Sequence, residues 1–114
     1  MPQHYRLYHV ISGTIRPGQH GAAAMWWREK GRSFFLSLPG VRGVQAYAPQ
    51  FGLGSTALEI WLEMDNYAAY DRGDEDMLAN PEKYATFDEM SAFLDSGPSR
   101  LMGEWPGSDL EHPE

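Results

Sequence analysis

The segment from Thr56 to Met64, TALEIWLEM, alternates two kinds of side chain without interruption. One set is aliphatic and the other is mixed: Leu58, Ile60, Leu62 and Met64 against Ala57, Glu59, Trp61 and Glu63. Successive side chains of a β-strand point to opposite faces, so this pattern predicts a strand with two different surfaces. The aliphatic surface is suited to packing under helices, whereas the surface that carries Trp61 needs another cover.

Turn and capping signals place the remaining elements around this strand. We expect further strands at residues 4–12, 44–48 and 100–105, a helix at 19–38 that bends near Gly31, and a short helix at 67–72. Asp65 or Asn66 is suited to cap the short helix. Residues 73–76 read as a mobile acidic loop, and residues 73–79 as a natural lid. A second long helix is expected from Asn80-Pro81, a cap followed by proline at the first helical position, to Gly97.

The predicted order of elements is strand, helix, strand, strand, helix, strand. A chain of this size with that order forms an α+β, ferredoxin-like βαββαβ fold, in which a four-stranded antiparallel sheet carries both helices on one face. We expect residues 1–105 to form one domain and residues 106–114 to form a flexible acidic tail.

The sheet face without helices would expose a large aromatic surface. It collects Arg6, Tyr8, Val10, Tyr47, Glu59, Trp61 and Glu63. Several hundred Å² of apolar area, at roughly 25 cal/mol per Å², would favour pairing of two copies through this face. Arg6 could then meet Glu59 or Glu63 across strands or subunits. The alternative is a sheet that stays open to water and is kept soluble by its carboxylates.

Composition excludes several classes of function. The net charge of -7 and the pI near 4.9 disfavour binding to nucleic acids and to anionic membranes. The chain has no cysteine, which excludes disulfides and thiolate nucleophiles or ligands. We see neither a signal-peptide pattern at the start nor an apolar run near the roughly 20 residues of a membrane span. We therefore expect a cytoplasmic protein.

Four phrases together resemble the dimeric α/β-barrel superfamily: IRPGQ, SLPGVRGVQAY, ALEIWLEMDNYAAYDR and NPEKYATFDEM. This superfamily includes antibiotic-biosynthesis monooxygenases, stress-responsive barrel proteins, EthD-like proteins and NIPSNAP-like proteins. The resemblance covers about residues 4–105. It implies a homodimer in which two sheets form a shared barrel, with a ligand cavity in each subunit between sheet and helices.

Such a cavity would be lined by the side chains that face the helices. His9 lies in the middle of the first strand on that side, and its ordinary pKa near neutrality suits it as a general base. The alternatives are a core histidine hydrogen-bonded to a backbone carbonyl and a histidine at the edge of the sheet. The other candidate ligand-binding residues are aromatic or cationic: Tyr5, Trp27, Tyr70, Lys83, Tyr84 and Phe87. These tyrosines could donate hydrogen bonds to a ligand, although such residues also serve as packing.

The sequence contains no pattern that indicates a cofactor or a metal site. The resemblance implies that haem-binding relatives use a histidine on the second helix, where this chain has Lys83 and Tyr84. Lys83 could instead attract an anionic substrate. No spacing typical of a metal site, a nucleotide loop or a serine nucleophile occurs. We therefore expect no metal and no cofactor.

Two functions remain open. The first is a cofactor-independent monooxygenase or isomerase that acts on an aromatic or polyketide-like molecule. The second is a non-catalytic dimeric binding or structural module of the stress-responsive barrel type. An enclosed pocket that contains His9 would favour the first, and a filled core would favour the second.

Overall fold

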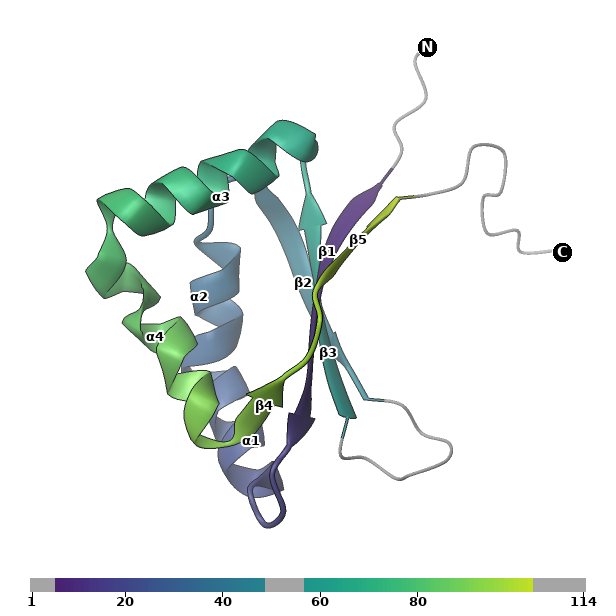
Figure 1. Ribbon diagram of the computed structural model, residues 1–114, viewed down its shortest axis with the longest axis vertical. Coiled ribbons are helices and arrows are strands. Elements are labelled where there is room, and N and C mark those ends of the chain that lie inside the picture. Colours follow the sequence, from purple (N-terminus) through teal and green to yellow (C-terminus); the bar gives the residue numbers. More distant parts are fainter. Residues whose placement is uncertain (1–5, 49–56, 104–114) are drawn as a thin grey trace, which may run out of the picture.

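The computed structural model describes residues 6–48 and 57–103. The predictions for Tyr5 and for the tail at 106–114 lie outside the described residues. Five antiparallel strands form one sheet: β1 (Leu7–Ile15), β2 (Val41–Tyr47), β3 (Ala57–Met64), β4 (Leu94–Ser96) and β5 (Arg100–Gly103). Across the sheet the strands follow the order β2-β3-β1-β4. β4 pairs with residues 13–15 of β1, and β5 pairs with residues 7–10 of the same strand. All the helices cover one face of this sheet (Figure 1). The predicted α+β, ferredoxin-like fold is confirmed.

The helical layer has two arms. The first comprises α1 (His20–Trp26), a π-helical turn (Trp27–Gly31) and α2 (Arg32–Leu36). The second comprises α3 (Tyr67–Ala79), a 3-10 turn (Pro81–Tyr84), α4 (Ala85–Asp88) and another 3-10 turn (Glu89–Ala92). None of these described helices is long and apolar enough to span a bilayer.

Strand register places the aliphatic side chains under the helices as expected. His9 of β1 lies opposite Leu62 of β3, and Ile11 lies opposite Ile60. Val44 of β2 also pairs with Leu62. Ile60 and Leu62 are almost completely buried, together with Phe35 of α2. The core therefore lies between this face of the sheet and the two helical arms.

The expected helix at residues 19–38 differs from prediction in its phase. The sequence pattern placed Trp27 inward with Ala23 and Phe34, but Trp26 is the buried tryptophan and Trp27 is half-buried. A π-helical turn holds one residue more than an α-helical turn, so it brings Trp26 and Phe34 to the same face. Gly31 permits this arrangement, because a Cβ at that position would overlap the Trp26 ring.

The predicted acidic loop and lid are wrong. Residues 73–79 continue α3, which runs without a break from Tyr67 to Ala79. Asp76 receives hydrogen bonds from side chains of the following turn, and these contacts stabilise the acidic end of the helix. The cap at Asn66 is confirmed, since its side chain accepts a hydrogen bond from Ala69 N at 3.0 Å. Asn80 is not a side-chain cap, because its amide instead donates to Asp76 at 2.9 Å.

The edge beyond β1 also differs from prediction. The second helical arm ends at Ala92, and the short strand β4 follows before Gly97-Pro98, where the sequence predicted that a long helix stops. β1 continues to Ile15 through Gly13, which has no side chain; a Cβ at this position would lie 2.7 Å from Leu94 Cγ, so glycine leaves room for Leu94. Ser12 holds the β4–β5 linker by donating from its hydroxyl to the Pro98 carbonyl at 2.6 Å. The linker therefore lies over one edge of the space between sheet and helices.

Candidate functional site

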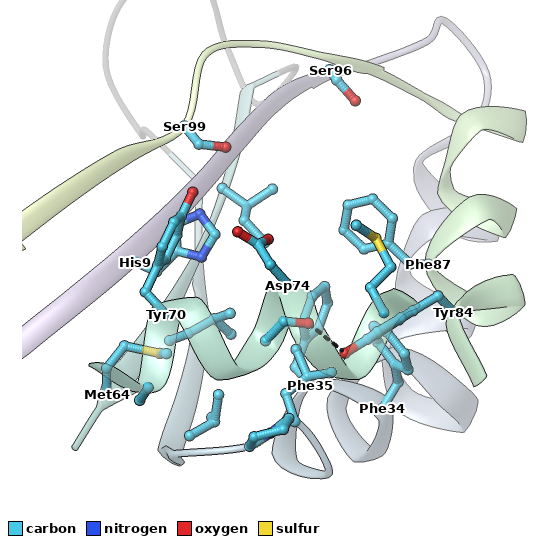
Figure 2. Close-up of a pocket in the computed structure, with 18 of the residues that line it drawn as sticks. His9, Phe34, Phe35, Met64, Tyr70, Asp74, Tyr84, Phe87, Ser96 and Ser99 are labelled. Atoms are coloured by element: carbon cyan, nitrogen blue, oxygen red, sulfur yellow. Dashed lines mark hydrogen bonds between the residues drawn. The ribbon is translucent and has the colours of Figure 1, made fainter. Parts of the chain in front are cut away.

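A cavity of about 440 Å³ lies between the sheet and the helices (Figure 2). Its inner wall consists of buried apolar side chains from α2, β3 and α3: Phe34, Phe35, Leu62, Met64 and Ala69. Its outer members are exposed and come from α3, α4 and residues 96–99, which comprise the end of β4 and the linker to β5: Tyr70, Asp74, Met77, Phe87, Asp88, Ser96, Gly97 and Ser99. The cavity is therefore apolar inside and opens to water between these three segments.

His9 is placed in the cavity wall by the alternation of β1. Its imidazole is half-buried and lies edge to face against the Tyr70 ring, with the ring centroids 5.0 Å apart. Burial lowers the pKa of His9 below its ordinary value of 6.5, and the negative charge of Asp74 opposes this effect in part. Among the described residues the imidazole has no hydrogen-bond partner. The lowered pKa favours the neutral form of His9 at pH 7, and none of the described protein groups occupies its nitrogens.

Asp74 enters the site from α3. It lies four residues after Tyr70, and residues with this spacing share one face of a helix. Figure 2 shows its carboxylate pointing into the cavity on the side where His9 and Tyr70 lie. This carboxylate therefore supplies a negative charge near the imidazole. That charge raises the pKa of His9 and so opposes part of the effect of burial.

The Tyr84 hydroxyl is held by protein groups at the opposite wall. It donates to Asp76 Oδ2 at 2.7 Å and also lies 3.4 Å from the Gly73 carbonyl oxygen. Burial and the neighbouring Asp76 carboxylate raise the pKa of Tyr84 above its ordinary value. Hydrogen bonds from Lys83 and Tyr84 lower the pKa of Asp76. The Tyr84 ring therefore lines the cavity, while its hydroxyl proton is already used in the hydrogen bond to Asp76.

The cavity brings together four of the predicted site residues, His9, Tyr70, Tyr84 and Phe87. Two others lie elsewhere. Trp27 packs on Phe35, with the ring centroids 6.1 Å apart, and does not line the cavity. The Lys83 ammonium lies 2.8 Å from Asp76 Oδ2 and donates to the Ser37 carbonyl at 3.2 Å, so it faces away from the cavity.

Sequence reasoning missed Asp74 and Phe35; it placed Phe34 on the inward face of the first helix without assigning it to the cavity. The signal for Asp74 was its i+4 spacing from Tyr70, which is meaningful only once residues 73–79 are recognised as helical. Phe35 was missed because the π-helical turn changes the phase of the first arm. Within the described residues, no group of three His, Asp or Glu side chains could hold a metal ion.

The opposite face of the sheet carries a second aromatic group. Trp61 lies between Tyr8 and Tyr47, with ring centroids 5.3 Å and 5.6 Å apart, and these residues line a hollow of about 290 Å³. Arg100 of β5 binds Glu59 through two hydrogen bonds of 3.1 Å and 3.3 Å. This pairing, together with the Trp61 indole, lowers the pKa of Glu59. Arg100 was not among the residues that the sequence assigned to this face.

Comparison with solved structures shows the same fold in several proteins. A NIPSNAP family protein from Agrobacterium tumefaciens aligns over 95% of this chain and 93% of its own, with a TM-score of 0.75 and 14% identity. A NIPSNAP domain protein from Burkholderia xenovorans aligns over 93% and 99%, with a TM-score of 0.66 and 15% identity. SnoaB, a cofactor-independent oxygenase from Streptomyces nogalater, aligns over 94% and 98%, with a TM-score of 0.61 and 14% identity. No protein-family model and no curated protein sequence matches this chain.

These comparisons confirm the predicted resemblance at the level of the fold. The chain shares the ferredoxin-like α+β architecture with both NIPSNAP proteins and the cofactor-independent oxygenase. Identities of 14–15% show the architecture alone. The chemistry must therefore be argued from the cavity.

Proposed function

We propose that this protein binds a small, largely apolar molecule in the cavity and removes a proton from it with His9. The observation that carries this proposal is an imidazole in the wall of an apolar cavity of about 440 Å³, with no hydrogen-bond partner among residues 6–48 and 57–103. Cavities of roughly 300–1,000 Å³ with apolar walls and a few polar groups are typical of small-molecule sites. In a structural module with a fully packed core, we would not expect a space of this size beside a neutral base.

The environment of His9 suits it to accept a proton. Its lowered pKa keeps the imidazole neutral at pH 7, which is the form that acts as a base. The imidazolium that forms is then stabilised by the nearby Asp74 carboxylate. Tyr70 packs against the imidazole and limits the orientations of its ring. The proposed step is transfer of a proton from an acidic C–H or O–H group of the ligand to a nitrogen of His9.

The apolar and aromatic walls favour an aromatic or polyketide-like substrate. Loss of a proton from such a molecule gives a delocalised anion, and this anion is the species that isomerises or reacts with oxygen without a cofactor. The shared fold with a structure described as a cofactor-independent oxygenase supports this class of reaction. A non-catalytic binding module is the competing function, and it predicts binding without proton transfer.

The proposal includes a homodimer formed through the open sheet face. Tyr47 is 52% exposed and Met102 is 37% exposed on that face, beside the half-buried Trp61. The hollow of about 290 Å³ beside Trp61 lies on the same surface, and side chains of the second copy could fill it. The predicted interface residues Arg6, Tyr8, Tyr47, Glu59, Trp61 and Glu63 all belong to this side of the sheet or its margin. Pairing there leaves the cavity mouth, on the helical side, open to solvent.

Proton abstraction can be tested with 2-tetralone, an aromatic ketone with acidic C–H groups. We expect the protein to accelerate hydrogen–deuterium exchange at these groups above the rate in buffer, as measured by NMR. Because a general base contributes on the order of 100-fold or more, His9→Gln should lose about that factor. Tyr84→Phe is the control, since it keeps the ring of a lining residue. Exchange that is unchanged in His9→Gln, or binding without any acceleration, would contradict the catalytic proposal.

A further inference from the structure

The charges that line the cavity are all of one sign. Asp74 and Asp88 lie at its mouth, and none of the described lining residues is Lys or Arg. The nearby Lys83 is engaged with Asp76 and Ser37 on the other side of its turn. His9 adds no positive charge at pH 7, because burial lowers its pKa. The entrance to the cavity is therefore negative.

The two carboxylates at the mouth are also uncompensated. Within the described part of the chain, neither Asp74 nor Asp88 has a hydrogen-bond or ion-pair partner for its carboxylate. Elsewhere in the helical layer, Asp76 pairs with Lys83 at 2.8 Å and Glu89 with Lys30 at 3.3 Å, whereas Asp71, Glu75 and Glu82 also have no partner among the described residues. Asp74 and Asp88 differ from these other unpaired carboxylates because they line the cavity.

From this we infer that the ligand carries a cationic amine on an apolar body, with the ammonium group held at the mouth by Asp74 and Asp88. The inference rests on the proposed function, because it assigns a charge to the ligand of the same cavity. The apolar body would contact the inner wall of phenylalanines and aliphatic side chains. A ligand with a carboxylate or phosphate at that end would meet repulsion and no cationic partner. The net charge of -7 further favours the approach of cations.

Three probes share a naphthalene ring and differ in the charge of the attached group: 2-naphthylmethylamine, 2-naphthylmethanol and 2-naphthoate. Comparing their affinities separates the contribution of charge from that of the buried apolar ring. We expect the amine to bind about tenfold more tightly than the carboxylate in calorimetry at low salt, with the alcohol between them. Added salt should narrow this difference, because it screens charges near the surface. The expected order follows from attraction of the amine and repulsion of the carboxylate by the same two side chains.

Variants then assign the preference to its residues. Asp74→Asn/Asp88→Asn should remove the difference between amine and carboxylate while the affinity for the alcohol stays unchanged, which also reports an intact cavity. Asp71→Asn is the matched control, because Asp71 lies on α3 outside the cavity lining and its substitution removes the same charge. This control should keep the tenfold preference.

The outcomes distinguish this inference from the proposed function. If the carboxylate binds as tightly as the amine, or the preference survives in the double variant, the charge assignment is wrong while the cavity remains a binding site. If none of the three probes binds, the proposed function fails and the charge assignment fails with it.

Discussion

The rings of His9 and Tyr70 lie edge to face with their centroids 5.0 Å apart. His9 belongs to the central strand β1 and Tyr70 to α3, so this contact joins the sheet to the helical layer at the cavity. The Tyr70 ring covers part of the imidazole, and burial is the main cause of the lowered pKa of His9. The protonation state of the proposed base therefore depends on how α3 packs.

Titration of His9 by NMR tests this relationship. We expect its pKa below 6.5 in the folded protein. Asp74→Asn should lower the pKa further, because it removes the charge that favours the imidazolium. Tyr70→Ala should raise it towards 6.5, because water then reaches the imidazole. A pKa that rises in Asp74→Asn would contradict the assigned electrostatics.

The same shift has a consequence for stability. Well above pH 6.5 His9 is neutral in both the folded and unfolded chains, and it contributes no pH dependence. As the pH falls below 6.5, the unfolded chain binds the proton first, so the free energy of unfolding decreases until the folded pKa is passed. His9→Gln should lack this component of the slope in denaturant titrations at a series of pH values.

Gly31→Ala offers a test of the packing of the first helical arm. Alanine normally favours a helix, by up to about 1 kcal/mol relative to glycine. At this position its Cβ would overlap the Trp26 ring, so we expect a net loss of about 1–3 kcal/mol in the free energy of unfolding. Gly21→Ala in α1 is the control, since a Cβ there meets no atom within 4 Å. A stabilised Gly31→Ala variant would show that Trp26 does not pack there.

The fold could be predicted because its determinants are local. The alternation at residues 57–64 and the cap at Asn66 specify a strand and a helix start without reference to the rest of the chain. The α+β order and the helix-covered sheet face follow from such signals. These features needed no knowledge of contacts between distant residues.

The errors arose where side-chain contacts or an irregular helical turn override the preference of single residues. Gly73 and the acidic run after it favour a loop, yet α3 continues because Lys83, Tyr84 and Asn80 bind Asp76. The π-helical turn likewise reverses the roles of the two adjacent tryptophans. Both errors concealed parts of the cavity, so His9 was identified while the neighbouring Asp74 was not.

The proposed dimer can be tested with Trp61→Glu. This substitution places a charge at the centre of the aromatic group on the open sheet face, so we expect light scattering to change from the mass of a dimer to that of a monomer. Met25→Glu is the control, because Met25 is 53% exposed on α1 in the helical layer, away from that face. A wild-type monomer, or a Trp61→Glu variant that remains dimeric, would refute the assigned interface.

Binding within the cavity is tested most directly by mapping 2-naphthylmethanol onto the amide NMR spectrum. The account predicts shifts at His9, Tyr70 and Asp74, retained in Ile11→Val but lost in Ile11→Trp, because Ile11 lines the cavity and the larger ring would fill it. Shifts centred instead on Trp61, or equal binding by wild type and Ile11→Trp, would contradict it.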